Sequence, residues 1–137
     1  MEARVVGKTK SAGFQFGIRR TFPVSREEAW AFLLSPEGLR LWLGELASLD
    51  LQIKGTYETK EGTTGEIRVA KLHEQLRLTW RKADWDKPST YQIRLLDAGE
   101  GKTTVAFHQE QLSGPHEREN AKRRLEAAMA VLSGKFS

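Results

Sequence analysis

Residues 116–136 read HERENAKRRLEAAMAVLSGKF, and the apolar side chains of this stretch recur at helical spacing. They form one stripe made of Ala121, Leu125, Ala128, Met129, Leu132 and Phe136. Pro115 fits the first position of a helix, and Gly134 fits a C-terminal stop. A helix of this length measures roughly 31 Å and can cross a small sheet from end to end. Because it cannot bury its stripe alone, it predicts a sheet to pack against.

The chain ahead of this helix opens with a strand and two short helices. Alternating apolar and polar residues predict a half-buried strand over residues 14–22. A capping box over residues 25–28 starts the first helix. Ser35 and Pro36 start the second helix, and Gly44 fits its end.

A meander of strands fills the middle of the chain. Six strands are predicted, over residues 49–53, 56–59, 66–69, 76–81, 91–95 and 103–111. Each has one polar face, which is typical of a sheet solvated on one side and covered on the other.

The order of elements predicts an α+β helix-grip fold. We expect a seven-stranded curved antiparallel sheet that wraps a long C-terminal helix, with two short helices after the first strand. Residues 14–137 are expected to form this single domain. Residues 1–13 are basic without an apolar core, so we interpret them as a flexible lead-in and not as a signal peptide.

Composition argues against several classes of function. There are no cysteines, which rules out disulfides and fits the cytoplasm, our expected location. No apolar run approaches the roughly 20 residues of a membrane span. The net charge of +4 comes from 22 basic and 18 acidic residues that are mixed along the chain. The basic run over residues 118–124 is interrupted by acidic residues and indicates a solvated helix face, so we expect no nucleic-acid partner.

Groups for catalysis are sparse. The three histidines, His73, His108 and His116, lack metal-ligand spacing. The glycines do not form a phosphate-binding loop. We therefore predict no catalytic residue, no metal and no cofactor, and an enzymatic role is not favoured. The sequence leaves the oligomeric state open.

Several short motifs follow one another in a fixed order. They are Phe22-Pro23-Val24-Ser25, Glu28-Ala29-Trp30, Ser35-Pro36-Glu37-Gly38-Leu39, Leu41-Trp42-Leu43, Gly55-Thr56-Tyr57, Gly65-Glu66-Ile67, Leu76-Arg77-Leu78-Thr79-Trp80 and Gly101-Lys102-Thr103-Thr104-Val105. Together they resemble the activator of heat-shock-protein-90 ATPase homologues, a branch of the START and birch-pollen-allergen superfamily (SRPBCC). The resemblance covers residues 14–132. Leu125 stands where many relatives carry tryptophan, and Gly55 where relatives often have two glycines.

The resemblance implies a sheet that wraps the last helix, often around a hydrophobic cavity. Superfamily members bind lipids, sterols, hormones or polyketides, and a few are cyclases or dehydratases. We therefore expect a small apolar or amphipathic molecule to bind between the sheet and the C-terminal helix. The expected lining is Phe16, Ile18, Trp42, Trp80, Tyr91, Ile93, Phe107, Leu125 and Met129. Trp42 and Trp85 are expected at the mouth of this cavity.

Two polar residues break the apolar faces of strands that would be neighbours. Arg20 lies on the first strand and Gln109 on the last, so their side chains are expected close together. A buried guanidinium needs a partner, so this pair could be a polar anchor for a ligand. Alternatively, both side chains lie near strand ends and reach solvent at the rim, or they take part in an internal ion pair.

Two other classes of function stay open. The family name implies docking onto a heat-shock chaperone, which would use an exposed outer surface and need no cavity. A cyclase-like enzyme would need a carboxylate or a histidine inside the pocket, and the strand alternation places neither there.

Overall fold

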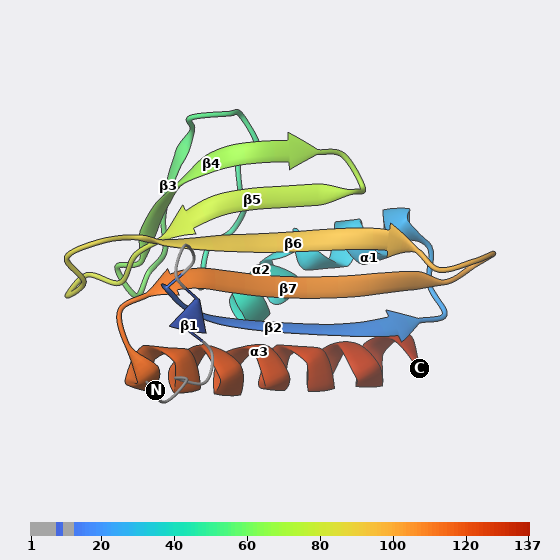
Figure 1. Cartoon of the computed structure of the whole chain (residues 1–137). Helices are drawn as coiled ribbons and strands as arrows, with labels where there is room; N and C mark the ends of the chain where they lie inside the picture. Colours follow the sequence, from blue (N-terminus) through green and yellow to red (C-terminus); the bar gives the residue numbers. More distant parts are fainter. Residues whose placement is uncertain (1–7, 10–12) are drawn as a thin grey trace, which may run out of the picture.

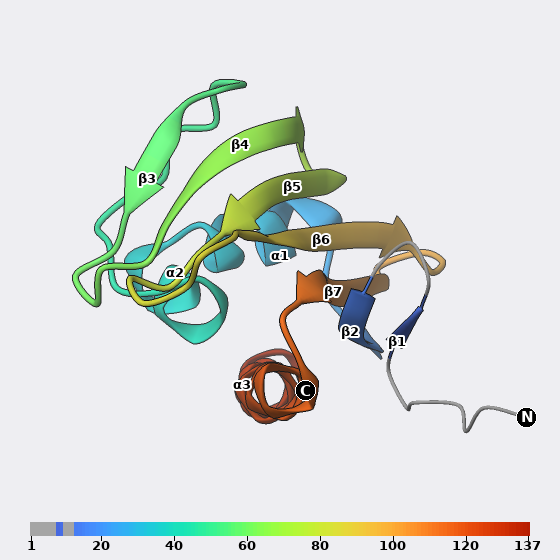
Figure 2. The same cartoon turned by 60° about the vertical axis from the view of Figure 1, so that its left-hand side comes forward.

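The structure is a computed structural model that describes residues 8–9 and 13–137. The helix α3 lies lengthwise along β2 and β7 (Figure 1), and α2 also contacts it. Figure 2, which looks along α3, shows the sheet curving over α1, α2 and α3. The elements are β1 (Lys8–Thr9), β2 (Gly13–Phe22), α1 (Arg26–Leu33), α2 (Pro36–Trp42), β3 (Thr56–Glu58), β4 (Thr64–Lys71), β5 (Gln75–Trp80), β6 (Ser89–Asp97), β7 (Thr103–Leu112) and α3 (Pro115–Phe136).

The sheet is antiparallel, with the strand order β1-β2-β7-β6-β5-β4-β3. Its six main strands, β2 to β7, are all among the predicted ones. The two-residue strand β1 adds to the edge by pairing Lys8 with Phe14, within the predicted lead-in. The remainder of that lead-in, residues 1–7 and 10–12, lies outside the described residues.

The predicted strand over residues 49–53 is wrong. Of the seven predicted strands, six are present as the main strands of the sheet. This segment belongs to the loop between α2 and β3, where Gly55 N donates to Gln52 O in a turn. Leu49 and Leu51 pack against the core, whereas Ile53 is 54% exposed. A loop that buries alternate side chains shows the same sequence pattern as a strand, although it pairs with no neighbouring strand.

The two short helices begin where predicted. Ser25 Oγ accepts from Glu28 N at 3.1 Å, and Ser35 Oγ accepts from Gly38 N at 3.1 Å. Gly38 lies against the end of α1, where an added Cβ would be 1.9 Å from Phe32 O. The absence of a side chain at this position lets α2 turn back tightly onto α1.

The C-terminal helix buries the predicted stripe. It begins at Pro115, and its buried residues are Ala121, Leu125, Ala128, Met129 and Leu132. Gly134 does not stop the helix, which continues to Phe136. The Phe136 ring packs edge-on against Phe22 and Phe32, with centroid distances of 5.9 and 5.7 Å, and this contact holds the last turn on the core. Among the described residues, no helix combines the length and apolar character needed to cross a membrane.

Candidate ligand-binding site

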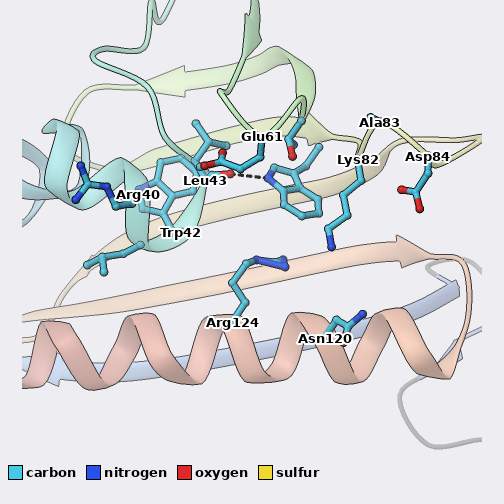
Figure 3. Close-up of a pocket in the computed structure, with 13 residues that line it drawn as sticks. Arg40, Trp42, Leu43, Glu61, Lys82, Ala83, Asp84, Asn120 and Arg124 are labelled. Atoms are coloured by element: carbon cyan, nitrogen blue, oxygen red, sulfur yellow. Dashed lines mark hydrogen bonds between the residues drawn. The ribbon is translucent and has the colours of Figure 1, made fainter.

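A pocket of about 570 Å³ opens between α2 and the first half of α3 (Figure 3). This volume lies in the usual range of small-molecule sites. Its apolar wall includes Leu41, Trp42, Leu43 and Trp80. The polar and charged groups around it are Arg40, Glu61, Thr63, Lys82, Asp84, Asn120 and Arg124.

Two tryptophans of the wall are fixed by their indole N–H groups. Trp42 Nε1 donates to Leu33 O at 2.9 Å. Trp80 Nε1 donates to Leu43 O at 2.9 Å, the bond dashed in Figure 3. Tyr91 packs edge-on against both rings, at centroid distances of 5.6 Å from Trp42 and 6.2 Å from Trp80. The wall is therefore a rigid aromatic surface whose polar atoms are already satisfied.

Arg124 brings a positive charge from α3 to this aromatic wall. The guanidinium carbon lies 4.3 Å from the ring centroid of Trp80 and 5.6 Å from that of Tyr91. Its Nη2 donates to Gln109 Oε1. Within the described part of the chain, no carboxylate pairs with Arg124. The charge is held by two π faces and one amide oxygen.

A short relay of hydrogen bonds holds this guanidinium in place. Gln109 is completely buried, and its Nε2 donates to Ser89 Oγ at 2.8 Å. Ser89 Oγ in turn donates to Trp80 O at 2.7 Å. The relay runs from α3 through β7 and β6 to β5, so the sheet determines where the charge of Arg124 sits.

Two ionisable groups near the pocket have altered acidities. Burial raises the pKa of the Tyr91 phenol well above its usual value, so the hydroxyl stays protonated. This hydroxyl is buried and has no hydrogen-bond partner among the described residues. The backbone N–H of Glu45 donates to Glu61 Oε1 at 2.9 Å and lowers the pKa of the Glu61 carboxyl. Glu61 is therefore an ionised group at the pocket rim.

Two of the predicted lining residues, Trp42 and Trp80, line the pocket. Trp42 does not form an exposed mouth or lid, because its side chain is only 1% exposed. Trp85 is half-buried and packs against Trp80, with the two ring centroids 5.4 Å apart. Phe16 and Ile18 of β2 pack partly buried against the core.

The space predicted beneath the middle of α3 is filled by side chains. Several residues expected to line it belong to the buried hydrophobic core and are at most 2% exposed. They are Tyr91, Ile93, Phe107, Leu125 and Met129. The open volume described above lies to one side of these packed residues, beside α2 and the first half of α3.

The predicted proximity of Arg20 and Gln109 is wrong. Strand register places Phe16 opposite Gln109 and Arg20 opposite Val105, so the two polar residues are four positions apart along β2 and β7. Arg20 is exposed and its Nη1 donates to Ser133 Oγ at 2.6 Å, which matches the alternative in which it reaches solvent at the rim. Gln109 does point inward, as its strand alternation predicted.

Sequence reasoning missed Arg124 because it lies in the basic run that was interpreted as a solvated helix face. That interpretation is wrong for two of its arginines. Arg118 Nε donates to Gln15 O at 2.8 Å, and its guanidinium lies over the Phe16 ring. Helical spacing was the available signal, since Arg124 is three residues after Ala121 and four before Ala128, beside the buried stripe.

The fold is that of a helix-grip domain of the SRPBCC type. Residues 23–134 match the family described as Activator of Hsp90 ATPase homolog 1-like protein. The chain belongs to this family, as its short motifs indicated. No curated protein matches the chain.

Solved structures share the fold at low sequence identity. CalU16 from Micromonospora echinospora superimposes with a TM-score of 0.74 at 20% identity, covering 90% of this chain and 76% of CalU16. PFC0360w, an HSP90 activator from Plasmodium falciparum, gives a TM-score of 0.70 at 19% identity over 87% of this chain and 96% of its own. Protein CV1439 from Chromobacterium violaceum gives a TM-score of 0.74 at 18% identity over 89% and 96% of the two chains.

Proposed function

We propose that this protein binds a small amphipathic molecule in the pocket between α2 and α3. The observation that carries the proposal is the combination of a rigid aromatic wall with charged groups in one opening of about 570 Å³. Small-molecule sites commonly consist of apolar walls with a few converging polar groups. Trp42 and Trp80 would contact the apolar part of the ligand, and Gln109 would act through Arg124.

This proposal places the ligand at the open end of the sheet. The packed residues beneath the middle of α3 then serve as a rigid support for the pocket wall. Tyr91 has this role, since it contacts Trp42 and Trp80 from behind. Because the wall is already packed and hydrogen-bonded, binding requires little reorganisation of the protein.

Titration with sodium decanoate, followed by tryptophan emission, tests the proposal. We expect saturable quenching, because Trp42 and Trp80 are part of the pocket wall. The variant Ala83→Phe fills the pocket from an exposed loop position and should weaken binding at least about fivefold, roughly 1 kcal/mol. Ala98→Phe is the matched control, since Ala98 is also exposed but lies in the β6–β7 turn. No saturation in the unmodified protein, or equal affinity in both variants, would contradict the proposal.

A second candidate function is docking onto an Hsp90-type chaperone, which the family match favours. On the outer face of the sheet, Arg19 and Arg94 flank Ala106 in one register row. Both arginines are exposed, so this row would suit an acidic partner surface. Docking there predicts capture by immobilised chaperone that Ala83→Phe leaves unchanged, because Ala83 lines the pocket on the other side.

A further inference from the structure

We propose that the ligand of this pocket carries a carboxylate and that the Arg124 guanidinium binds it. The inference rests on the proposed function and adds the chemistry of the ligand head group. It is argued from the unfilled donors of Arg124, from its surroundings and from the charge of the pocket.

The donors of Arg124 are mostly unused. A guanidinium has five N–H donors in a fixed plane. In the described part of the chain Arg124 makes one hydrogen bond, from Nη2 to Gln109 Oε1. Its Nε is buried without a hydrogen-bond partner, and among the described residues the hydrogen bond of the guanidinium comes from Nη2 and not from Nη1. Figure 3 shows the side chain rising from α3 into the pocket, so the end of the fork faces the open volume.

The surroundings of Arg124 make an unpaired charge unfavourable. The guanidinium is half-buried and packs on the Trp80 ring, where water solvates it less than at the open surface. The ion pairs among the described residues use Arg26, Arg40, Arg68, Arg77 and Arg118, and not Arg124. A planar carboxylate matches the free end of the fork in bidentate geometry.

The charge of the pocket also favours an anion. Its lining contains three cationic side chains, Arg40, Lys82 and Arg124, and two carboxylates, Glu61 and Asp84. The Glu61 carboxylate already accepts the Glu45 N–H. Lys82 faces Arg124 from the opposite wall (Figure 3), so an anionic head group would lie between two cations. The indoles beside them would hold an apolar tail, which makes the ligand a monocarboxylic amphiphile.

Matched ten-carbon ligands test the inference: sodium decanoate, 1-decanol and decylamine, titrated below their micelle concentrations. We expect decanoate to bind at least about tenfold more tightly than decanol, and decylamine to bind least well. Arg124→Met should weaken decanoate binding at least about tenfold and leave decanol binding within about twofold. Arg123→Met is the matched control and should bind like the unmodified protein, because Arg123 is exposed, does not line the pocket and donates to Asn120 Oδ1 at 3.0 Å.

The outcomes distinguish failure of the carboxylate assignment from failure of the pocket proposal. Equal affinity of the unmodified protein for decanoate and decanol would overturn the carboxylate assignment and leave the pocket proposal standing. Binding of none of the three ligands would overturn both. If Arg124→Met does not fold, Arg124→Lys keeps the charge without the fork. This variant should bind decanoate more weakly than the unmodified protein does, without losing binding completely. Undiminished decanoate binding in either folded variant would contradict the assignment.

Discussion

Replacing Gly38 by alanine is expected to lower the free energy of unfolding by about 3 kcal/mol or more. The added Cβ would lie 1.9 Å from Phe32 O and 2.8 Å from Leu33 Cα. Both are backbone atoms at the end of α1, so no side-chain rotation can relieve the clash. Urea denaturation followed by tryptophan emission measures the loss, and the Tm should fall by roughly 10 °C.

The matched control for this prediction is Gly134→Ala. Gly134 lies within α3, and an added Cβ there would meet no atom within 4 Å. Alanine has the higher helix propensity, so this variant should gain up to about 1 kcal/mol. Equal stability of the two alanine variants would show that the contact between α1 and α2 is looser than the structure describes.

Replacing Gln109 by leucine is expected to cost about 2–4 kcal/mol of stability. Gln109 is completely buried, accepts from Arg124 and donates to Ser89 Oγ. Leucine fills a similar volume but leaves the guanidinium without its amide partner inside the protein. Gln92→Leu is the control, since Gln92 is half-buried on the outer face, where water can replace its bond from Gln75. It should change stability by less than about 1 kcal/mol.

A double variant separates the lost hydrogen bond from general packing effects. Gln109→Leu combined with Arg124→Met removes both the acceptor and the charge that needs it. We expect the pair to be less destabilised than the sum of the single variants, by about 1 kcal/mol or more. Strict additivity in chemical denaturation would show that Gln109 does not hold Arg124, and the relay from α3 to β5 would lose its role.

The fold was largely predictable because its signals are local. Hydroxyl caps at Ser25 and Ser35 and the apolar stripe of α3 each depend on residues within one or two turns of a helix. The strand predicted over residues 49–53 failed because alternation reports burial of every second side chain and does not report a pairing partner. Gly134 was misjudged for a related reason, since the packing of Phe136 extends the helix beyond it.

The site was less predictable because it depends on register and on how large side chains meet. The alternation of β7 correctly predicted that Gln109 points inward. Only the β2–β7 pairing shows that Phe16, and not Arg20, lies opposite it. No local pattern shows that Phe107 and Met129 fill the space beneath α3. Arg124 was overlooked because its charged side chain was assumed to be exposed to solvent.

The indole resonances of the protein provide the most direct test of where the ligand binds. In a ¹⁵N–¹H correlation spectrum, added decanoate should shift the Nε1–H signals of Trp42 and Trp80, whose rings line the pocket. The signal of Trp30 should stay in place, because that ring lies on α1 beside His73. Unmoved Trp42 and Trp80 signals at saturating decanoate, or an equal shift of Trp30, would contradict a ligand site between α2 and α3.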